Sequence, residues 1–216
     1  MSKETKTRIL AIIITLMLNK NMGQDVLKSK PAAFFDRDGV ICEFVDELSR
    51  IDQFRFRKGI AEAIRKLNEA NYWVFVATNQ PNIAKQKMTW DELQKIHEHM
   101  KQELLNQGAR IDHIYFCPHR VGGTLPEFSI DCACRKPKSG MLLQAAKEYP
   151  IEKARSFMVG DTWRDVECAK GFGIASIGVL GGAGFPYIPE EPEAKFVPDR
   201  LFQNPLEATD WWLSVN

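Results

Sequence analysis

Short apolar runs of strand length alternate with helical patterns from residue 32 onward, and this alternation limits the possible folds more than any other feature of the chain. Between residues 60 and 67, apolar side chains recur at the spacing of a helix with one buried face. The next run, 72–78, is rich in β-branched and aromatic residues, as strands are. Strands that alternate with helices form right-handed crossovers, so the chain is predicted to build a largely parallel sheet covered by helices on both faces.

Capping and turn residues bound the expected elements. The expected strands cover residues 32–35, 72–78, 111–116, 157–160 and 174–180. The expected helices cover residues 60–67, 89–108, 139–146, 162–170 and a short segment that Asn204 caps. Thr89 and Glu92 form a capping box, and Ser139 suits the cap of the next helix. Gly171 is expected to end the helix over 162–170.

The length of 216 residues fits one domain that can bury a full core. The sequence therefore predicts an α/β, Rossmann-like fold for a single domain over residues 31–216. Residues 1–30 form an N-terminal extension whose order we leave open. In a parallel sheet of this type, ligands bind at the carboxyl ends of the strands, so the functional site is expected there.

An apolar segment at residues 9–18 follows Lys3, Lys6 and Arg8, and so resembles the start of a secretory signal. No small-residue cleavage site follows it, and ten residues are too few to cross a bilayer. A helix packed on the domain and an upstream extension before Met22 are the alternatives, and the sequence leaves all three open. Three of the five cysteines lie near one histidine, which favours metal ligands in a reducing compartment. We therefore expect a cytoplasmic protein with no membrane partner.

Polar side chains follow three of the expected strands. Asp36 and Asp38 follow the first strand, Thr78 and Asn79 end the second, and Asp161 follows a later one. If these strands are parallel neighbours, their carboxylates converge at one edge of the sheet, where they repel one another unless a cation is bound. Hard oxygen ligands of this kind suit Mg²⁺, which also keeps waters and a phosphate oxygen in its shell.

Hydrolysis of a phosphomonoester gives each of these groups a task. The Asp36 carboxylate can attack phosphorus once charge on the phosphoryl oxygens is neutralised. Asp38, two residues along, is placed to protonate the leaving alkoxide and then to activate water. The Thr78 hydroxyl and the Lys136 ammonium can hold the transferring group by electrostatics and position.

The motifs resemble, in order, the four motifs of the haloacid dehalogenase superfamily. They are Asp36-x-Asp38-Gly39, Thr78-Asn79, Lys136 and Gly160-Asp161-x-x-x-Asp165, within residues 32–180. The resemblance implies Asp36 as nucleophile and Asp38 as acid and base. It implies Mg²⁺ held by the Asp36 and Asp161 side chains and the Asp38 main-chain carbonyl, with Thr78, Asn79 and Lys136 binding phosphate. For Asp165, an ion pair, a helix cap and an outer-shell role all fit.

A second set of ligands follows the third expected strand. Cys117 and His119 are separated by one residue, as are Cys132 and Cys134. Three thiolates and one imidazole form a closed tetrahedral set of the structural Zn²⁺ type. The metal would staple the loop between residues 120 and 131, which has little apolar material with which to order itself.

This set sharpens the resemblance to the group of heptose bisphosphate and histidinol-phosphate phosphatases, whose members lack a large cap domain. Arg135, beside Lys136, would by similarity contact the remote part of the substrate, such as a second phosphate, because a guanidinium binds phosphate as a fork. Thr162 departs from the lysine or arginine common at its position, and Pro81 replaces the usual serine. These departures concern specificity more than reaction type.

A small phosphorylated sugar or polyol is the expected substrate, with the C7 phosphate of D-glycero-D-manno-heptose 1,7-bisphosphate as the first choice. Histidinol phosphate is the alternative, since the acidic residues Glu43, Asp46 and Glu47 could face its cationic amine. A nucleic-acid 3′-phosphatase needs a basic strip that the net charge of +1 does not signal, so no nucleic-acid partner is expected. A non-catalytic binding module would lack a nucleophile or metal ligand, and all are present here.

We expect a monomer. His97, His99 and His113 are interpreted as helix-surface or strand-end residues.

Overall fold

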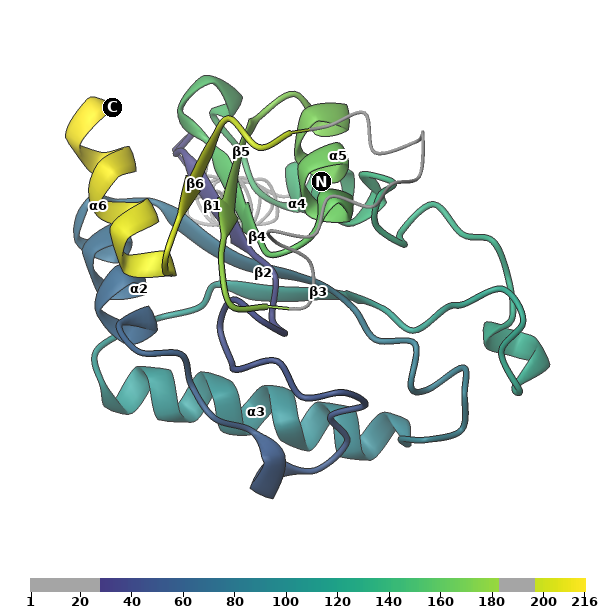
Figure 1. The fold of residues 1–216 in the computed structure, drawn as a ribbon. Coiled ribbons are helices and arrows are strands. Elements are labelled where there is room, and N and C mark those ends of the chain that lie inside the picture. Colours follow the sequence, from purple (N-terminus) through teal and green to yellow (C-terminus); the bar gives the residue numbers. More distant parts are fainter. Residues whose placement is uncertain (1–27, 183–196) are drawn as a thin grey trace, which may run out of the picture.

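The computed structural model describes residues 28–182 and 197–216, and it shows one sheet between two layers of helices (Figure 1). The apolar segment 9–18 and most of the N-terminal extension lie outside the described residues. The strands are β1 (Ala32–Phe35), β2 (Trp73–Asn79), β3 (His113–Cys117), β4 (Phe157–Gly160), β5 (Ala175–Val179) and β6 (Arg200–Phe202). Their order is β3-β2-β1-β4-β5-β6, and every neighbouring pair is parallel. The predicted parallel sheet is confirmed.

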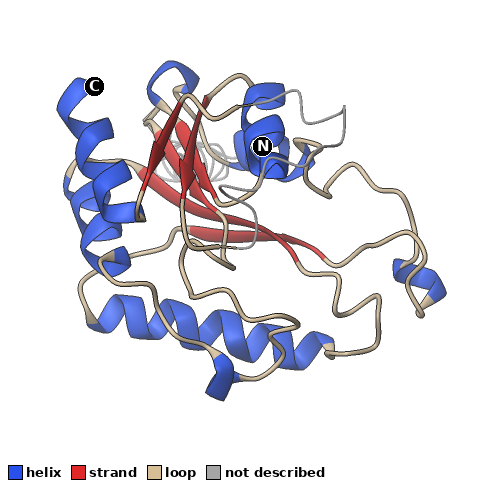
Figure 2. Cartoon of the chain, viewed as in Figure 1, coloured by secondary structure: helices blue, strands red, loops and turns tan. Residues whose placement is uncertain are grey.

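Helices cover both faces of this sheet (Figure 2). They are α2 (Ile60–Glu69), α3 (Trp90–Asn106), α4 (Gly140–Glu148), α5 (Trp163–Phe172) and α6 (Pro205–Val215), with short 3₁₀ turns η1 (Ile51–Gln53), η2 (Pro126–Phe128) and η3 (Lys153–Arg155). The described part of the chain inserts no separate folded domain between its strands: the connection from β1 to α2 carries only η1, and that from β3 to α4 only η2. None of the described helices has the length and apolarity needed to cross a bilayer.

The central strand β1 divides its side chains between two cores. Ala33 and Phe35 join the core under α2, α3 and α6, whereas Ala32 and Phe34 join the core under α4 and α5. All four side chains are fully buried. Each phenylalanine contributes about 1.5–3 kcal/mol by its burial, so the end of β1 is firmly anchored. The next residue, Asp36, is therefore presented at a rigid position on the edge of the sheet.

Three details differ from the sequence prediction. The Ser139 hydroxyl does not cap α4; it donates instead to the Cys168 carbonyl at 2.8 Å. Helix α5 continues through Gly171 and ends at Phe172, where it is capped by Gly173, whose φ of +86° is the left-handed conformation that favours glycine. A Cβ on Gly171 would lie 2.8 Å from the Ser139 hydroxyl oxygen, so this glycine allows close packing rather than helix termination. Strand β6 was not expected, because it has only three residues, two of them exposed.

Candidate active site and metal centre

The carboxyl ends of the central strands bring together residues that lie far apart in the sequence. Asp36 follows β1 and Asp161 follows its neighbour β4, while Lys136 reaches the same place from the segment before α4. The Lys136 ammonium lies 2.9 Å from Asp36 Oδ2 and 2.6 Å from Asp165 Oδ1. Carboxylate oxygens of Asp36, Asp161 and Asp165 lie within 4.8 Å of one another. All four side chains are buried.

This cluster sets three carboxylates against one ammonium. Burial raises the pKa of Asp36 to about 6, and the nearby Lys136 offsets this only in part. Burial disfavours the charged form of Lys136, but Asp165 and Asp36 outweigh it and raise the pKa of the ammonium. The remaining negative charge and the hard oxygen donors are what Mg²⁺ requires, so the residues present fit this metal.

Two glycines make room for the Asp161 carboxylate. A Cβ on Gly39 would lie 2.3 Å from Asp161 Oδ2, and one on Gly182 would lie 1.8 Å from the same atom. Gly39 also has a φ of +80°, which L side chains rarely adopt. Gly39 is therefore required for two reasons: its backbone is left-handed, and the Asp161 carboxylate occupies the space that a side chain would need.

The Asp165 carboxylate is used twice. Its Oδ1 binds the Lys136 ammonium, and its Oδ2 accepts from the Thr162 amide at 3.1 Å and from the Thr162 hydroxyl at 2.7 Å. The ion pair and the helix cap left open by the sequence are thus both present. Because it caps α5 and pairs with Lys136 at once, Asp165 ties the position of the ammonium to the start of this helix.

Asn79 and Thr78, at the end of β2, also contact the site. The Asn79 side chain donates to the Lys136 carbonyl and accepts from the Lys136 amide, both at 3.0 Å. It therefore holds the backbone that carries the ammonium. The buried Thr78 hydroxyl accepts from Gln80 Nε2 at 3.0 Å.

Asp38 contacts Arg37 and Gln80, to which the sequence analysis gave no role. The Arg37 guanidinium lies 3.0 Å from both Asp38 oxygens, and Gln80 Nε2 donates to Asp38 Oδ2 at 2.8 Å. Arg37 Nη1 in turn lies 3.4 Å from His97 Nε2. His97 is only 3% exposed, so its interpretation as a helix-surface residue is wrong. The available signal was its spacing, four residues after Leu93 and three before Met100 on the buried face of α3.

The cluster opens into a cavity of about 390 Å³, within the range of small-molecule sites. One part of the cavity wall is acidic and includes Asp36, Asp38 and Asp161. The side chains of Arg120, Arg135 and Arg164 also line the cavity, and the charges of Arg164 and Arg120 act on Arg135, so the three form one basic wall. Arg135 Nη1 donates to the His119 carbonyl at 2.8 Å, which links this basic wall to the predicted zinc loop.

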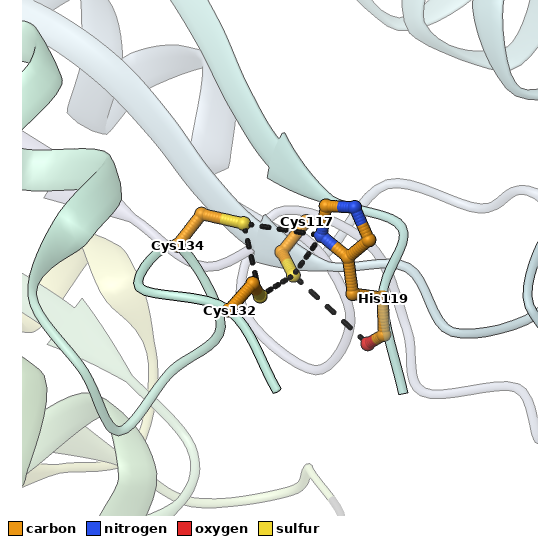
Figure 3. Close-up of side chains that lie close together, drawn as sticks. All are labelled: Cys117, His119, Cys132 and Cys134. Atoms are coloured by element: carbon orange, nitrogen blue, oxygen red, sulfur yellow. Dashed lines mark hydrogen bonds between the residues drawn. The ribbon is translucent and has the colours of Figure 1, made fainter. Parts of the chain in front are cut away.

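The four predicted zinc ligands converge at the end of β3 (Figure 3). Cys132 Sγ lies 3.4 Å from Cys117 Sγ and 3.2 Å from Cys134 Sγ. His119 Nδ1 lies 3.6 Å from Cys117 Sγ and 3.4 Å from Cys134 Sγ. A disulfide would need about 2.05 Å between sulfurs. Tetrahedral Zn²⁺ with bonds of about 2.0–2.3 Å needs ligand atoms about 3.3–3.8 Å apart. Three of these separations lie in that range and the one between Cys132 and Cys134 is slightly shorter, so the donor types and their convergence suit this metal.

The buried His97 predicts a specific loss of stability in acid. Burial, and then the charge of Arg37, lower its pKa from 6.5 to about 3. Below pH 6.5 the unfolded chain therefore takes up a proton that the folded chain refuses until about pH 3, and the free energy of unfolding falls as the pH drops through this window. This group alone removes up to about 2 kcal/mol between pH 6.5 and 5.

Denaturant unfolding at several pH values measures this loss. His97→Gln keeps an acceptor for Arg37 but carries no titrating ring, so its stability should depend less steeply on pH than that of the native chain. Identical slopes for the two proteins between pH 6.5 and 5 would show that His97 is protonated in the folded state.

Several known proteins are similar to this chain in sequence and in fold. The family model described as HAD-hyrolase-like matches residues 133–205. D-glycero-beta-D-manno-heptose-1,7-bisphosphate 7-phosphatase of Rhodopseudomonas palustris is 47% identical over 145 residues, which are 67% of this chain and 81% of that protein. The enzyme of the same name from Yersinia pestis is 39% identical over 179 residues, 82% of this chain and 95% of that protein. The crystal structure of D,D-heptose 1,7-bisphosphate phosphatase from B. bronchiseptica, complexed with magnesium and phosphate, superposes with a TM-score of 0.74 at 30% identity and covers 86% of this chain and 99% of that chain. The chain therefore belongs to the haloacid dehalogenase superfamily, within its family of heptose bisphosphate phosphatases.

Proposed function

We propose that this protein removes the C7 phosphate of D-glycero-D-manno-heptose 1,7-bisphosphate, using Asp36 as a nucleophile. The observation that carries the proposal is the Lys136 ammonium, 2.9 Å from Asp36 Oδ2 at the carboxylate cluster. An ammonium and a nucleophilic carboxylate that share one buried edge can both contact a single phosphoryl group. The substrates named for the relatives support the choice of sugar.

The reaction would proceed in two displacements. An Asp36 oxygen bonds to phosphorus while the bond from phosphorus to the sugar oxygen breaks, and Asp38 gives its proton to that oxygen. Asp38, now a carboxylate, then takes a proton from water as the water oxygen attacks the aspartyl-phosphate. The bond from Asp36 to phosphorus breaks and inorganic phosphate leaves. Thr78, Asn79 and Lys136 hold the phosphoryl oxygens.

Asp36, Asp161 and the Asp38 main-chain carbonyl would hold Mg²⁺. When bound, the ion supplies positive charge that offsets the phosphoryl oxygens and the neighbouring carboxylates. The four ligands Cys117, His119, Cys132 and Cys134 would hold a structural Zn²⁺, as the spacing of their atoms supports.

Arg135 is proposed to bind the second phosphate of the substrate. Burial, together with Arg164 and Arg120, lowers its pKa, so positive charge is concentrated in this wall of the cavity. A bidentate fork beside other guanidiniums suits a phosphate better than it suits a cationic amine. The basic wall therefore favours a bisphosphate.

The histidinol phosphate alternative rested on the acidic loop that contains Glu47. In the folded chain, Glu47 lies 3.2 Å from the Lys85 ammonium and 2.5 Å from that of Lys87, and hydrogen bonds from Lys87 and then Lys85 lower its pKa. This carboxylate is already neutralised by its neighbours. Asp46 and Glu47 both line the cavity, but with Glu47 paired to lysines, Asp46 is outnumbered there by Arg120, Arg135 and Arg164.

We also propose that residues 31–216 act as one catalytic domain, as a cytoplasmic monomer without a nucleic-acid partner. The net charge of +1 over 216 residues supports the last point, because a nucleic-acid enzyme needs an extended basic surface.

A panel of phosphate esters tests the substrate. With Mg²⁺, kcat/KM for the heptose bisphosphate should exceed that for histidinol phosphate and for a 3′-phosphorylated oligonucleotide by at least about 100-fold, the value of a well-placed bidentate contact. Activity on every ester should disappear when Mg²⁺ is chelated and return when it is restored.

Arg135→Gln provides the matched variant. It should lower kcat/KM for the bisphosphate toward the value for the heptose 7-monophosphate and leave the monophosphate value unchanged, because the monophosphate has no group for Arg135 to bind. Faster hydrolysis of histidinol phosphate than of the bisphosphate would refute the substrate but not the aspartyl-phosphate chemistry.

A further inference from the structure

Three buried polar side chains stand behind the partly exposed carboxyl of Asp38. Arg37, Gln80 and His97 are 1%, 2% and 3% exposed, whereas the Asp38 side chain is 23% exposed and lines the cavity. Burying a guanidinium and an amide is costly unless each is hydrogen bonded. The chain nevertheless places both at this point, so their contacts are a built feature of the site.

The contacts form a closed network. Arg37 approaches Asp38 through Nη2, 3.0 Å from each oxygen, and through Nε, 3.1 Å from Oδ1. Gln80 joins the two residues, since its Oε1 accepts from Arg37 Nη2 at 2.8 Å and its Nε2 donates to Asp38 Oδ2 at 2.8 Å. Rotation of the Asp38 carboxyl away from its position breaks charge-assisted hydrogen bonds to both partners.

His97 orients the guanidinium from the far side. Its ring packs edge-on against Phe116 with centroids 5.3 Å apart, and its Nε2 lies 3.4 Å from Arg37 Nη1. The low pKa of His97 keeps the ring neutral, so Nε2 is available as an acceptor. The guanidinium is therefore held between His97 of α3 and Asp38 of the strand-end loop, and it cannot turn into the cavity without losing partners on both sides.

We propose that Arg37, Gln80 and His97 form a clamp that positions the Asp38 carboxyl for proton transfer. The inference rests on the proposed function, in which Asp38 protonates the leaving oxygen. Proton transfer requires donor and acceptor at hydrogen-bond distance, and a displacement of about 1 Å can cost about 100-fold in rate. The three residues are positioning residues, because they act through Asp38 and contact no reacting atom.

Two substrates with different leaving groups can distinguish a positioning role of these residues from a purely structural one. A sugar alkoxide needs a proton in order to leave, whereas p-nitrophenolate leaves without one. Because kcat/KM reports only the steps through loss of the first product, it is insensitive to the later hydrolysis of the aspartyl-phosphate. Arg37→Lys keeps the charge but removes the fork. It should lower kcat/KM for the sugar phosphate about 30-fold more than kcat/KM for p-nitrophenyl phosphate, and Gln80→Leu about 10-fold more.

Two further variants complete the test. Asp38→Asn removes the proton donor itself, so its change in the ratio of the two kcat/KM values is the largest change that the clamp variants can approach. Ser176→Ala removes a buried hydroxyl that contacts Asp199 at 3.1 Å. Ser176 lies near the amino end of β5, whereas the site lies at the carboxyl ends of the strands, so this variant should leave the ratio of the two kcat/KM values unchanged. If Asp38→Asn shifts the ratio but neither Arg37→Lys nor Gln80→Leu does, the clamp is refuted and the acid role stands. If Asp38→Asn does not shift it either, the acid role fails and the clamp fails with it. Should Arg37→Lys not fold, Gln80→Leu decides alone.

Discussion

Replacement of Asp36 by asparagine is expected to lower kcat by at least about 10⁴-fold while the fold stays intact. An amide of the same shape cannot attack phosphorus, so no aspartyl-phosphate forms. A loss of this size raises the barrier by about 5.5 kcal/mol. Steady-state release of inorganic phosphate measures it. Brief exposure of the native protein to labelled substrate, followed by an acid quench, should trap label on the chain, and the same treatment of the Asp36→Asn variant should trap none.

Stability provides the control for this variant. Burial raises the pKa of Asp36 to about 6, which shows that the environment disfavours its charged form despite the Lys136 ion pair. An uncharged amide removes the cost of burying the charge and the repulsion from Asp165 and Asp38, which together outweigh the lost attraction to Lys136, so Tm should not fall. Asp210→Asn, an exposed replacement that loses only a pair with Lys66, should keep full activity. A variant Asp36→Asn that still turns over substrate would refute covalent catalysis by this residue.

The sequence was sufficient to locate Asp36, for a physical reason. Residues 32–35 are an unbroken apolar run, which is satisfied only in the interior of a sheet covered on both faces, and the first polar residue must then fall at the strand end. The same reasoning located Asp161 after β4. Periodicity could not locate Lys136, because it lies in the irregular segment before α4; only its place in the motif order predicted its approach to Asp36.

The clamp behind Asp38 shows where such reasoning stops. His97 is separated from Arg37 by 60 residues, and a polar residue on the buried face of α3 does not reveal which partner it meets. Gln80 poses the same problem, because its three side-chain partners come from two different strand ends. Contacts of this kind depend on how α3 packs against the sheet, which no local pattern encodes.

Removal of Zn²⁺ is expected to open the loop over residues 120–131 before the domain unfolds. The loop buries little of its own: its 3₁₀ turn η2 has no fully buried residue, Val121 and Ile130 are exposed, and Phe128 packs against the core only partly buried. Most backbone hydrogen bonds of this loop close within it, such as that from Arg120 N to the Phe128 carbonyl at 3.0 Å, and the bond from Leu125 N to the Ala84 carbonyl at 3.0 Å ties it to the rest of the domain. A metal that ties both ends of the loop therefore supplies order that packing does not.

Limited proteolysis reports this opening. Cleavage by chymotrypsin after Phe128 should accelerate about 10- to 100-fold on chelation of zinc or in Cys134→Ser, as expected when about 1.4–2.7 kcal/mol of local stability is lost. Metal analysis of the native protein should find about one zinc per chain. Cys168→Ala is the matched control, since this buried thiol lies outside the cluster and contacts the Lys138 carbonyl at 3.5 Å. It should keep both its zinc and its protected loop.

Loss of the metal should also weaken substrate binding, because Arg135 directly follows Cys134, the last of the predicted zinc ligands, and donates to the His119 carbonyl at 2.8 Å. When His119 is released, this anchor of the guanidinium moves with it. We therefore expect Cys134→Ser to raise KM for the bisphosphate while kcat falls less, since Asp36 and Lys136 are held by the sheet and by Asp165. Cleavage at equal rates with and without zinc would show that the loop is ordered by packing alone. An unchanged KM in Cys134→Ser would show that the metal does not support binding of the second phosphate by Arg135.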